Sequence, residues 1–445
     1  MPPRKLIDNQ PTVDAAAARI NLRHLQAFAA VAAHGSVTRA AESLFRVASA
    51  ITRAVAELEE SLGTPLFERK ARGMLLNAFG EAVQARAKRV EDEFAAACVE
   101  LAPAEPVPRG ANAARLDART LMASMFNGRR LAIVAGLSEM QNMPAAARAF
   151  GVTQPAVSTL VSELEARCGR ELFVRSARGV TPTRAGLALA FRFKRVLAEL
   201  RSIDSDIAAI GGVVQGSVVV GALPLGRTLI LPSAIAALVR QHPRLHVSTV
   251  ESPYEALAAQ LRSGDVDFIL GALRPPESAP DLTQEVLFDD CISLIARLGH
   301  PLAGLREIGF DDLRNSQWVL SRPGSPSRDL LEQFFRDAVQ PSPAPTVETG
   351  DLAILRGLLL QSDMLTAISA HQLHYEIEGG SLVVLNLPLE KTQRKIGITQ
   401  RAGALASPGA RALIAEIREV VALNESAHRP RAGTIPSHSN RSRHP

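Results

Sequence analysis

The sequence repeats itself over its first half, and this repeat constrains the fold more than any other feature. Glu57-Leu58-Glu59 recurs as Glu163-Leu164-Glu165, and Leu66-Phe67 recurs as Leu172-Phe173, each 106 residues later. Aligned without gaps, residues 22–93 and 128–199 are identical at about a third of their positions. A solenoid needs about three or more repeats, so two copies predict a tandem pair of similar domains.

The second copy has the spacing of a helix-turn-helix motif. Ala147 is small enough to let two helices approach, Gly151 supplies the turn at low steric cost, and Val157 locks the second helix onto the first. Thr153 is suited to the N-cap, and Pro155 falls in the first turn, where its missing N–H costs nothing. Gln154 and Ser158 then share one face of the helix that normally enters the major groove.

A wing and a long helix follow this motif. Residues 172–175 and 178–183 predict a short strand pair with a glycine-containing turn. Arg175 and Arg178 are placed to meet phosphates beside the groove, and the alternative is two solvated surface arginines. Residues 185–210 predict a long amphipathic helix, a natural dimerisation element. Between the copies, Pro103, Pro106, Pro108 and Gly110 interrupt the first long helix and make residues 103–114 a linker.

The charge of the chain is uneven. Residues 1–212 carry 28 Lys and Arg against 21 Asp and Glu, whereas residues 213–425 carry 18 against 24. A basic first half attached to an acidic second half indicates that only the first half meets a polyanion such as DNA. Random variation of surface charge is the alternative, so charge alone does not decide the function.

No metal site, cofactor or membrane segment is expected. Cys98, Cys168 and Cys291 have neither metal-ligand nor disulfide spacing, and Cys291 is expected to pack in a buried strand. No apolar run reaches the roughly 18 residues that span a bilayer. The sequence shows no phosphate-binding glycine loop, nucleophile elbow or metal-spaced ligand set. We therefore expect a cytoplasmic protein that is not an enzyme.

From residue 216 the pattern changes to short apolar strands alternating with helices. This alternation predicts an α/β domain with a mostly parallel sheet, with strands at 217–221, 246–250 and 264–270. In such folds ligands bind outside the carboxyl ends of the strands. The loops after these three strands are therefore expected to converge on a binding site.

Together these features resemble LysR-type transcriptional regulators. The DNA-binding resemblance rests on Ala40-Ala41, Glu57-Leu58-Glu59, Gly63, Pro65-Leu66-Phe67-Glu68-Arg69 and their counterparts in the second copy. The family pattern has one such domain, so two copies are a departure from it. The second half is similar to the family's effector domain, which looks like the two-lobed periplasmic binding proteins, at Leu231-Pro232, His242-Pro243, 261–267, 299–302 and Trp318-Val319.

The copies differ at the residues that the resemblance places on DNA. Copy one has Ala48 where the family commonly has glutamine, and Phe45 in the turn, whereas copy two keeps Gln154 but has Thr159 in place of an arginine. We expect copy two to carry most base-specific readout. The alternatives are a solvated Gln154 and, for Arg53, a surface salt bridge to the residue four positions on. The DNA-binding candidates are Ser36, Thr52, Arg53, Arg69, Arg72, Thr153, Gln154, Pro155, Ser158, Thr159, Arg175 and Arg178.

The same resemblance implies an effector site in a cleft between two lobes, at about 215–274 with 378–424 and at about 285–373. Serine hydroxyls and free N–H groups at helix starts suit an organic acid or a sugar. Each candidate has a purely structural role in its loop as the alternative. The candidates are Leu223, Pro224, Leu225, Gly226, Ser252, Leu273, Arg274, Ser325, Ser327, Arg328 and Asp351.

The predicted fold is α/β overall, with two tandem winged helix-turn-helix domains before a two-lobed effector domain like a periplasmic binding protein. Its expected parts are an N-terminal tail (1–21), two winged units (22–102 and 128–212), a linker region (103–127), the effector domain (213–425) and a disordered tail (426–445). We expect an effector-responsive regulator that binds double-stranded promoter or operator DNA as a homodimer or homotetramer. The alternatives are a sensor in which one helix-turn-helix unit mediates protein interaction, and an enzyme built on the α/β domain.

Overall fold

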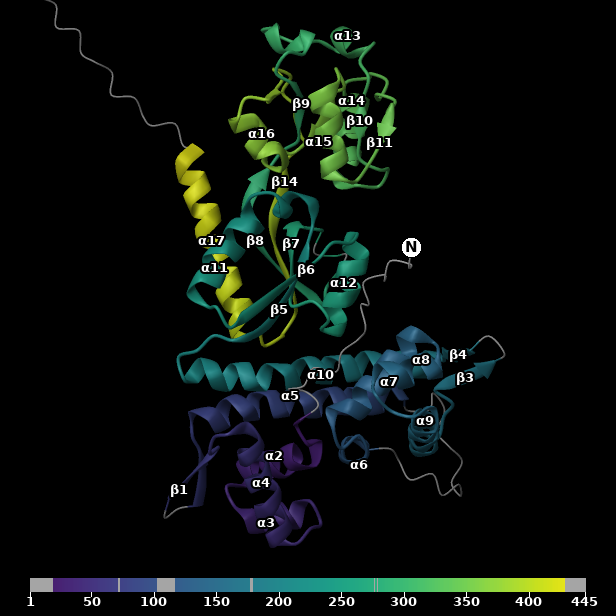
Figure 1. Ribbon diagram of the computed structural model, residues 1–445, viewed down its shortest axis with the longest axis vertical. Helices are drawn as coiled ribbons and strands as arrows, with labels where there is room; N and C mark the ends of the chain where they lie inside the picture. The colour runs from purple at the N-terminus through teal and green to yellow at the C-terminus, as the bar shows by residue number, and fades with distance from the viewer. Residues whose placement is uncertain are drawn as a thin grey trace, which may run out of the picture. The chain divides into compact units, whose positions relative to one another are not determined.

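The computed structural model describes residues 19–70, 73–101, 117–176, 179–275, 277 and 279–428 (Figure 1). It contains two compact units, which are treated separately: residues 1–221, 242–269 and 403–410 form the first, and the remaining residues form the second. Most of both predicted tails, much of the predicted linker, Arg72 and Arg178 lie outside the described residues.

The first copy folds as a winged helix-turn-helix. Its elements are α2 (Leu22–His34), α3 (Val37–Ser43), α4 (Ala48–Leu62), β1 (Phe67–Lys70), β2 (Gly73–Leu76) and the long helix α5 (Ala78–Leu101). Asn21 begins α2 by accepting a hydrogen bond from the N–H of Arg23, and Gly35 ends it with φ of +61°. The two strands pair antiparallel, with Phe67 opposite Leu76.

The second copy repeats this order. Its elements are α7 (Gly128–Met140), α8 (Met143–Ala149), α9 (Gln154–Cys168), β3 (Phe173–Ser176), β4 (Gly179–Pro182) and α10 (Arg184–Ile210). The predicted N-cap of α9 is confirmed, because the hydroxyl of Thr153 accepts a hydrogen bond from the N–H of Ala156 at 3.4 Å. A short helix, α6 (Ala118–Ser124), lies in the region expected to be a linker.

Residues that are identical in the two copies make the same contacts in each. Glu59 accepts a hydrogen bond from the N–H of Leu66 at 2.7 Å, and Glu165 accepts one from Leu172 at 2.8 Å. The helices that follow each wing approach these leucines so closely that a Cβ on Gly80 or Gly186 would lie 2.1 Å from the leucine carbonyl oxygen. The strict repeat at these positions is therefore required by backbone packing.

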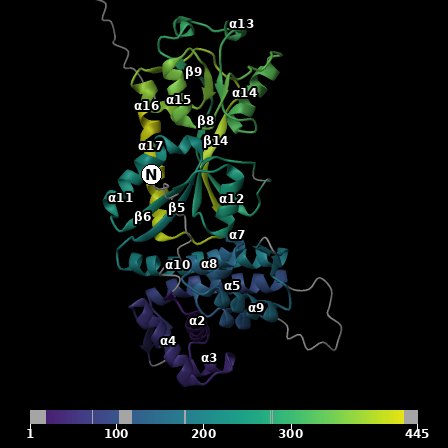
Figure 2. The same ribbon diagram turned by 45° about the vertical axis from the view of Figure 1, so that its right-hand side comes forward.

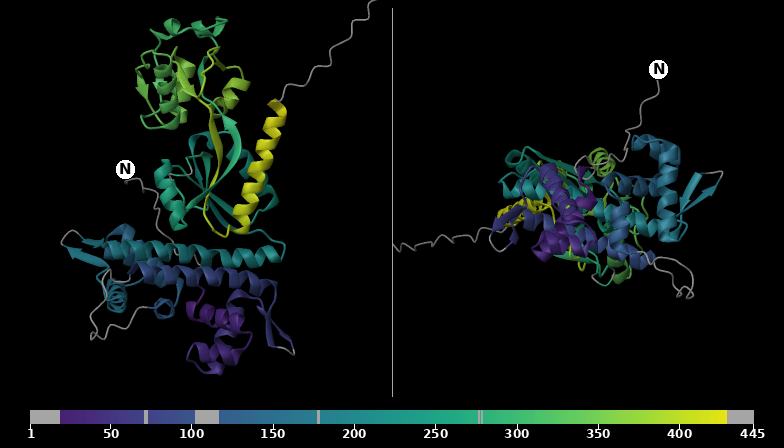
Figure 3. Two further views of the ribbon diagram at one scale, coloured as in Figure 1. Left: turned by 180° about the vertical axis from the view of Figure 1, so that it is seen from behind. Right: turned by 90° about the horizontal axis from the view of Figure 1, so that it is seen from below.

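Both copies share one hydrophobic core, in which α5 and α10 lie side by side (Figures 1 and 3). Val90 of α5 and Val196 of α10 are fully buried there, and the rings of Phe94 and Phe193 stand 5.9 Å apart. The sequence favours α10 as a dimerisation element. In this chain its partner helix is α5 of the same chain.

The second half of the chain contains a five-stranded sheet in the order β6-β5-β7-β14-β8. Its strands are β5 (Gly216–Ala222), β6 (Leu245–Val250), β7 (Phe268–Ala272), β8 (Leu282–Asp290) and β14 (Arg394–Arg401), and its helices are η1 (Pro224–Arg227), α11 (Ile230–Gln241), α12 (Tyr254–Ser263) and α17 (Pro408–His428). β5 and β6 are parallel, and β14 pairs antiparallel with β8, which Figure 2 shows beside it. β7 begins at Phe268, later than expected, because Gly264 ends α12 with φ of +82°.

A second lobe surrounds β9 (Ser293–Arg297), which pairs antiparallel with β12 (Thr366–Ile368) and β13 (Leu382–Val384). Its other elements are η3 (Pro301–Gly304), α13 (Phe310–Leu313), β10 (Val319–Leu320), α14 (Pro326–Asp337), β11 (Val347–Glu348), α15 (Leu352–Gln361), η4 (Ala370–Leu373) and α16 (His374–Glu378). Trp318 packs edge-on against Phe335 in the core of this lobe.

The expectation for Cys291 is wrong. Strand β8 ends at Asp290, whose carboxylate accepts hydrogen bonds from Ser369 and Arg394, and Cys291 is exposed in the link to β9. The apolar residue that turns inward at this point is Ile292. In the described parts of the chain, none of the helices has both the length and the apolar character to cross a bilayer.

Candidate DNA interface and effector site

The second-copy recognition helix presents its first turn to solvent. Gln154 is the first residue of α9 and is exposed, as are Pro155 and Thr159, while Ser158 is half-buried. The wing reaches this helix, because Nη2 of Arg175 on β3 donates a hydrogen bond to Oγ of Ser158 at 3.2 Å. The structure therefore brings wing and recognition helix together on one surface.

The first-copy recognition helix is more self-contained. Oγ1 of Thr52 donates to the carbonyl of Ala48 at 3.1 Å, and Arg53 forms an ion pair with Glu57 at 2.7 Å. The hydrogen bond from Arg53 lowers the pKa of Glu57, which also pairs with His24. Arg53 thus adopts the salt bridge that the sequence left open.

Two further first-copy candidates have described backbones, with Ser36 preceding α3 and Arg69 lying in β1.

The turns of the two motifs follow the same backbone path with different side chains. Gly151 adopts a left-handed conformation with φ of +58°, and Phe45 occupies the equivalent position with φ of +52°. A residue with a Cβ is strained in this region. The Phe45 side chain is 96% exposed, so burial of its ring does not offset the backbone strain.

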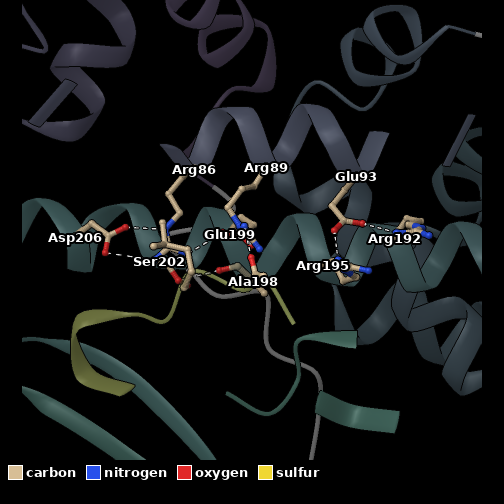
Figure 4. Close-up of polar contacts among 11 residues, drawn as sticks. Arg86, Arg89, Glu93, Arg192, Arg195, Ala198, Glu199, Ser202 and Asp206 are labelled. Carbon is tan, nitrogen blue, oxygen red and sulfur yellow. Dashed lines mark hydrogen bonds and ion pairs between the residues drawn. The ribbon is translucent and has the colours of Figure 1, made fainter. Parts of the chain in front are cut away.

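Ion pairs between α5 and α10 hold the two motifs together (Figure 4). Arg86 is almost completely buried and donates to Glu199 and Asp206, each at 2.7 Å, and to the carbonyl of Leu405 at 2.8 Å. Burial alone would lower the pKa of Arg86, but the hydrogen bonds and charges of the two carboxylates raise it above its ordinary value. Arg89 donates to Glu199 and to the carbonyl of Gly403.

The loop after β5, expected to contact an effector, is tightly packed. The N–H of Leu223 donates to the carbonyl of Leu270 at 3.0 Å, and a Cβ on Gly271 would lie 2.4 Å from Cβ of Leu223. Leu223, Leu225 and Gly226 are buried and Pro224 is exposed. This loop therefore offers mainly backbone groups to a ligand.

Three serine hydroxyls meet at the start of α14. Oγ of Ser325 donates to Oγ of Ser321 at 2.8 Å, and Oγ of Ser327 lies 3.1 Å from the same atom. Ser325 is the N-cap residue, but its side chain makes no capping hydrogen bond. Ser321 was not among the sequence candidates, although the serine spacing in residues 321–327 would have pointed to it.

The other effector candidates make structural contacts or belong to the other compact unit. Asp351 caps α15 by accepting from two N–H groups, at 2.8 and 3.0 Å, and the buried Arg328 pairs with Glu332. The backbone of Arg274 is held by Gln284, and the N–H of Leu273 donates to the carbonyl of Lys395. Ser252 is half-buried between β6 and α12 in the first unit.

A separate cavity of about 210 Å³ lies elsewhere in the second unit. It is lined by Leu229, Ile230, Phe288, Asp289, His371, Val421 and Asn424. The ring of His371 packs edge-on against Phe288 at 5.4 Å. None of the sequence candidates is among these lining residues, and no sequence motif pointed to this cavity.

Domain comparisons cover most of the chain. A model described as "LysR substrate binding domain" matches residues 211–422. A model described as "Bacterial regulatory helix-turn-helix protein, lysR family" matches twice, at residues 22–81 and 129–187. The two matches correspond to the two copies of the repeat.

Whole-chain comparisons give the same picture. The HTH-type transcriptional regulator GalR of Pseudomonas putida is 48% identical over 401 residues, covering 90% of this chain and 97% of the relative. GbpR of Azospirillum brasilense is 26% identical and covers 68% of this chain but 89% of its own length. A solved structure of full-length CbnR with its target DNA is 21% identical, with a TM-score of 0.48, and covers 66% of this chain and 99% of CbnR. About a third of this chain therefore has no counterpart in GbpR, whereas almost all of it has one in GalR.

Proposed function

The chain belongs to the LysR family of bacterial transcription regulators, and we propose that it reads DNA mainly through α9 and senses a small anionic or polyhydroxylated effector beside α14. Regulators of this family bind DNA and small-molecule effectors and are oligomeric, and they are not enzymes. We place this chain in the cytoplasm, where promoter DNA is, as a homodimer or homotetramer.

The base-reading role of α9 is supported by its first turn. The Gln154 amide offers both a donor and an acceptor to a base edge in the major groove. Thr153 caps the helix beneath it, and Gly151 forms the preceding turn. Ala48, the equivalent of Gln154, offers only a methyl group. Copy one then contributes phosphate contacts, through Arg53 once it leaves Glu57, and through Arg69.

The serine cluster is the observation that carries the effector proposal. The first N–H groups of a helix have no intrahelical partners and favour an anion. At α14 these groups adjoin the hydroxyls of Ser321, Ser325 and Ser327, and the N-cap side chain leaves them uncapped. A carboxylate or several sugar hydroxyls would satisfy both sets of groups.

A thermal-shift screen of the full chain with carboxylates and sugars tests this assignment. A ligand at 100 times its dissociation constant stabilises its binding domain by about 2.7 kcal/mol. We expect Ser325→Ala combined with Ser327→Ala to abolish the shift, while Ser325→Thr, which keeps the hydroxyl, retains it. Loss of the shift in Asp289→Asn, with Ser325→Ala unaffected, would instead place the ligand in the 210 Å³ cavity.

A further inference from the structure

The contacts between α5 and α10 come in pairs related by the 106-residue repeat. Arg86 of α5 pairs with Glu199 of α10 at 2.7 Å. The counterpart of Arg86 is Arg192, the counterpart of Glu199 is Glu93, and these two residues also form an ion pair, at 2.9 Å (Figure 4). In each copy, therefore, the equivalent arginine pairs with the equivalent glutamate of the other copy.

Four further ion pairs form two sets that are related by the repeat in the same way. The pair between Arg89 and Glu199, at 2.8 Å, has its counterpart between Arg195 and Glu93, at 2.5 Å. The pair between Arg86 and Asp206 has its counterpart between Arg192 and Glu100. Contact positions rise along α5 as they fall along α10, so the helices are antiparallel.

A backbone contact outside the helices agrees with these pairs. Asn21, just before α2, forms an antiparallel bridge with Asn127, which is its own counterpart 106 residues later. A surface that contacts its own equivalent in this way is isologous, which is the property of an interface with two-fold symmetry. The chain therefore contains, within itself, the local two-fold symmetry of a dimer.

We propose that a single chain supplies both recognition helices of a two-part operator, with α4 in one half-site and α9 in the other, inverted half-site. The proposal rests on the DNA-binding function above and deepens it by specifying the partner. Two-fold symmetric helix-turn-helix dimers place their recognition helices in half-sites about 10–10.5 base pairs apart, or a multiple of that distance.

The two half-sites of this operator differ in sequence. A homodimer reads a palindrome because its two recognition helices are identical. Here the equivalent exposed positions carry Ala48 against Gln154 and Arg53 against Thr159. The half-site under α9 is specified by base contacts, and the half-site under α4 tolerates more substitutions.

Selection of duplexes from a randomised library with the full chain tests this arrangement. We expect the enriched motif to contain two unlike, inverted halves, and Gln154→Ala to loosen the sequence of one half only. A palindrome of only two half-sites, both loosened by Gln154→Ala, would overturn the inference, because it would require α9 from two chains. A homodimer of the proposed arrangement would instead select four half-sites, of which only the two under α9 are loosened. A motif with a single half would also overturn the inference, and would assign copy one to protein interaction.

A matched variant in the first copy should gain affinity where Gln154→Ala loses specificity. Ala48 is exposed at the start of α4, so Ala48→Gln installs the copy-two side chain without disturbing the core. On a duplex that carries the α9 half-site in both positions, we expect Ala48→Gln to bind roughly 5- to 150-fold more tightly than the unmodified chain. An equal affinity of the two proteins contradicts the placement of α4. A folded chain, checked by circular dichroism, that enriches no DNA at all contradicts the proposed function itself.

Discussion

Replacing Arg86 and its counterpart Arg192 separately by methionine should have unequal effects on stability. The Arg86 side chain is 1% exposed and holds two carboxylates, whereas Arg192 is 18% exposed. Removing one partner of a buried ion pair costs about 3–5 kcal/mol, because the remaining charge stays buried without a partner. We expect Arg86→Met to fall in this range, and Arg192→Met, whose carboxylates are closer to water, to cost about 1–2 kcal/mol.

Urea unfolding of the full chain measures both effects with two signals. Ellipticity at the helical minimum follows mainly the helix-rich first unit, while fluorescence of Trp318, the sole tryptophan, follows the second lobe. With a denaturant slope of about 2–3 kcal/mol per molar, Arg86→Met should lower the helical midpoint by roughly 1–2.5 M. The Trp318 midpoint should move much less.

The difference between the two variants tests whether burial sets the strength of the ion pairs. Because the two arginines are equivalent by the repeat, each is the control for the other. Equal shifts in the two variants, or a larger shift in Arg192→Met, would show that burial does not set the strength of these pairs. A shift in Arg86→Met below about 1 kcal/mol, the value of an exposed pair, would refute the reasoning.

Three further outcomes are expected. Replacing both Arg175 and Arg178 by alanine should weaken binding to all duplexes and reduce the slope of log affinity against log salt by about one unit per lost phosphate contact. Fluorescence anisotropy measures this slope, and an unchanged slope would show that the wing does not contact the DNA backbone. Phe45→Gly should raise the unfolding free energy by about 1 kcal/mol by relieving the left-handed strain, and a lower urea midpoint would contradict this. At pH 8 a thiol reagent should modify the exposed Cys291 well before Cys168, because burial raises the pKa of the Cys168 thiol to about 11 and only the thiolate reacts. The rates should converge as the pH approaches 11, and equal labelling of the peptides at pH 8, by mass spectrometry, would contradict the assignment.

Local signals in the sequence were sufficient to predict the winged motifs. Thr153, Gly151 and Pro155 act within a few residues of their own positions, and their roles follow from backbone geometry. The partner of α10 depends on contacts far apart in the chain, and helical periodicity cannot specify it. The signal was nevertheless present, because Arg86 and Glu93 recur as Arg192 and Glu199, and surface residues have no reason to repeat so strictly.

The candidate effector residues were harder to choose from the sequence than the residues that build the winged motifs. Asp351 was chosen as a polar loop residue, but a carboxylate two and three residues before free N–H groups is equally the pattern of a helix cap, which is what it forms. Ser325 and Ser327 were candidates because they lie at a helix start, and the structure adds Ser321, whose hydroxyl lies within hydrogen-bond distance of both. The prediction for Cys291 was wrong for a similar reason: strand β8 ends one residue earlier, at Asp290, and the sequence pattern does not locate a strand end to a single residue.

The covalent connection between α5 and α10 also changes how operator occupancy depends on the amount of protein. Two separate chains lose an interface of this kind on dilution, because each must find its partner in solution. Within one chain the partner helix is present at a fixed effective concentration, whatever the number of molecules in the cell. If one chain is sufficient for one two-part site, as proposed, occupancy of that site should rise with the first power of the chain concentration, because no second chain has to be recruited to complete it.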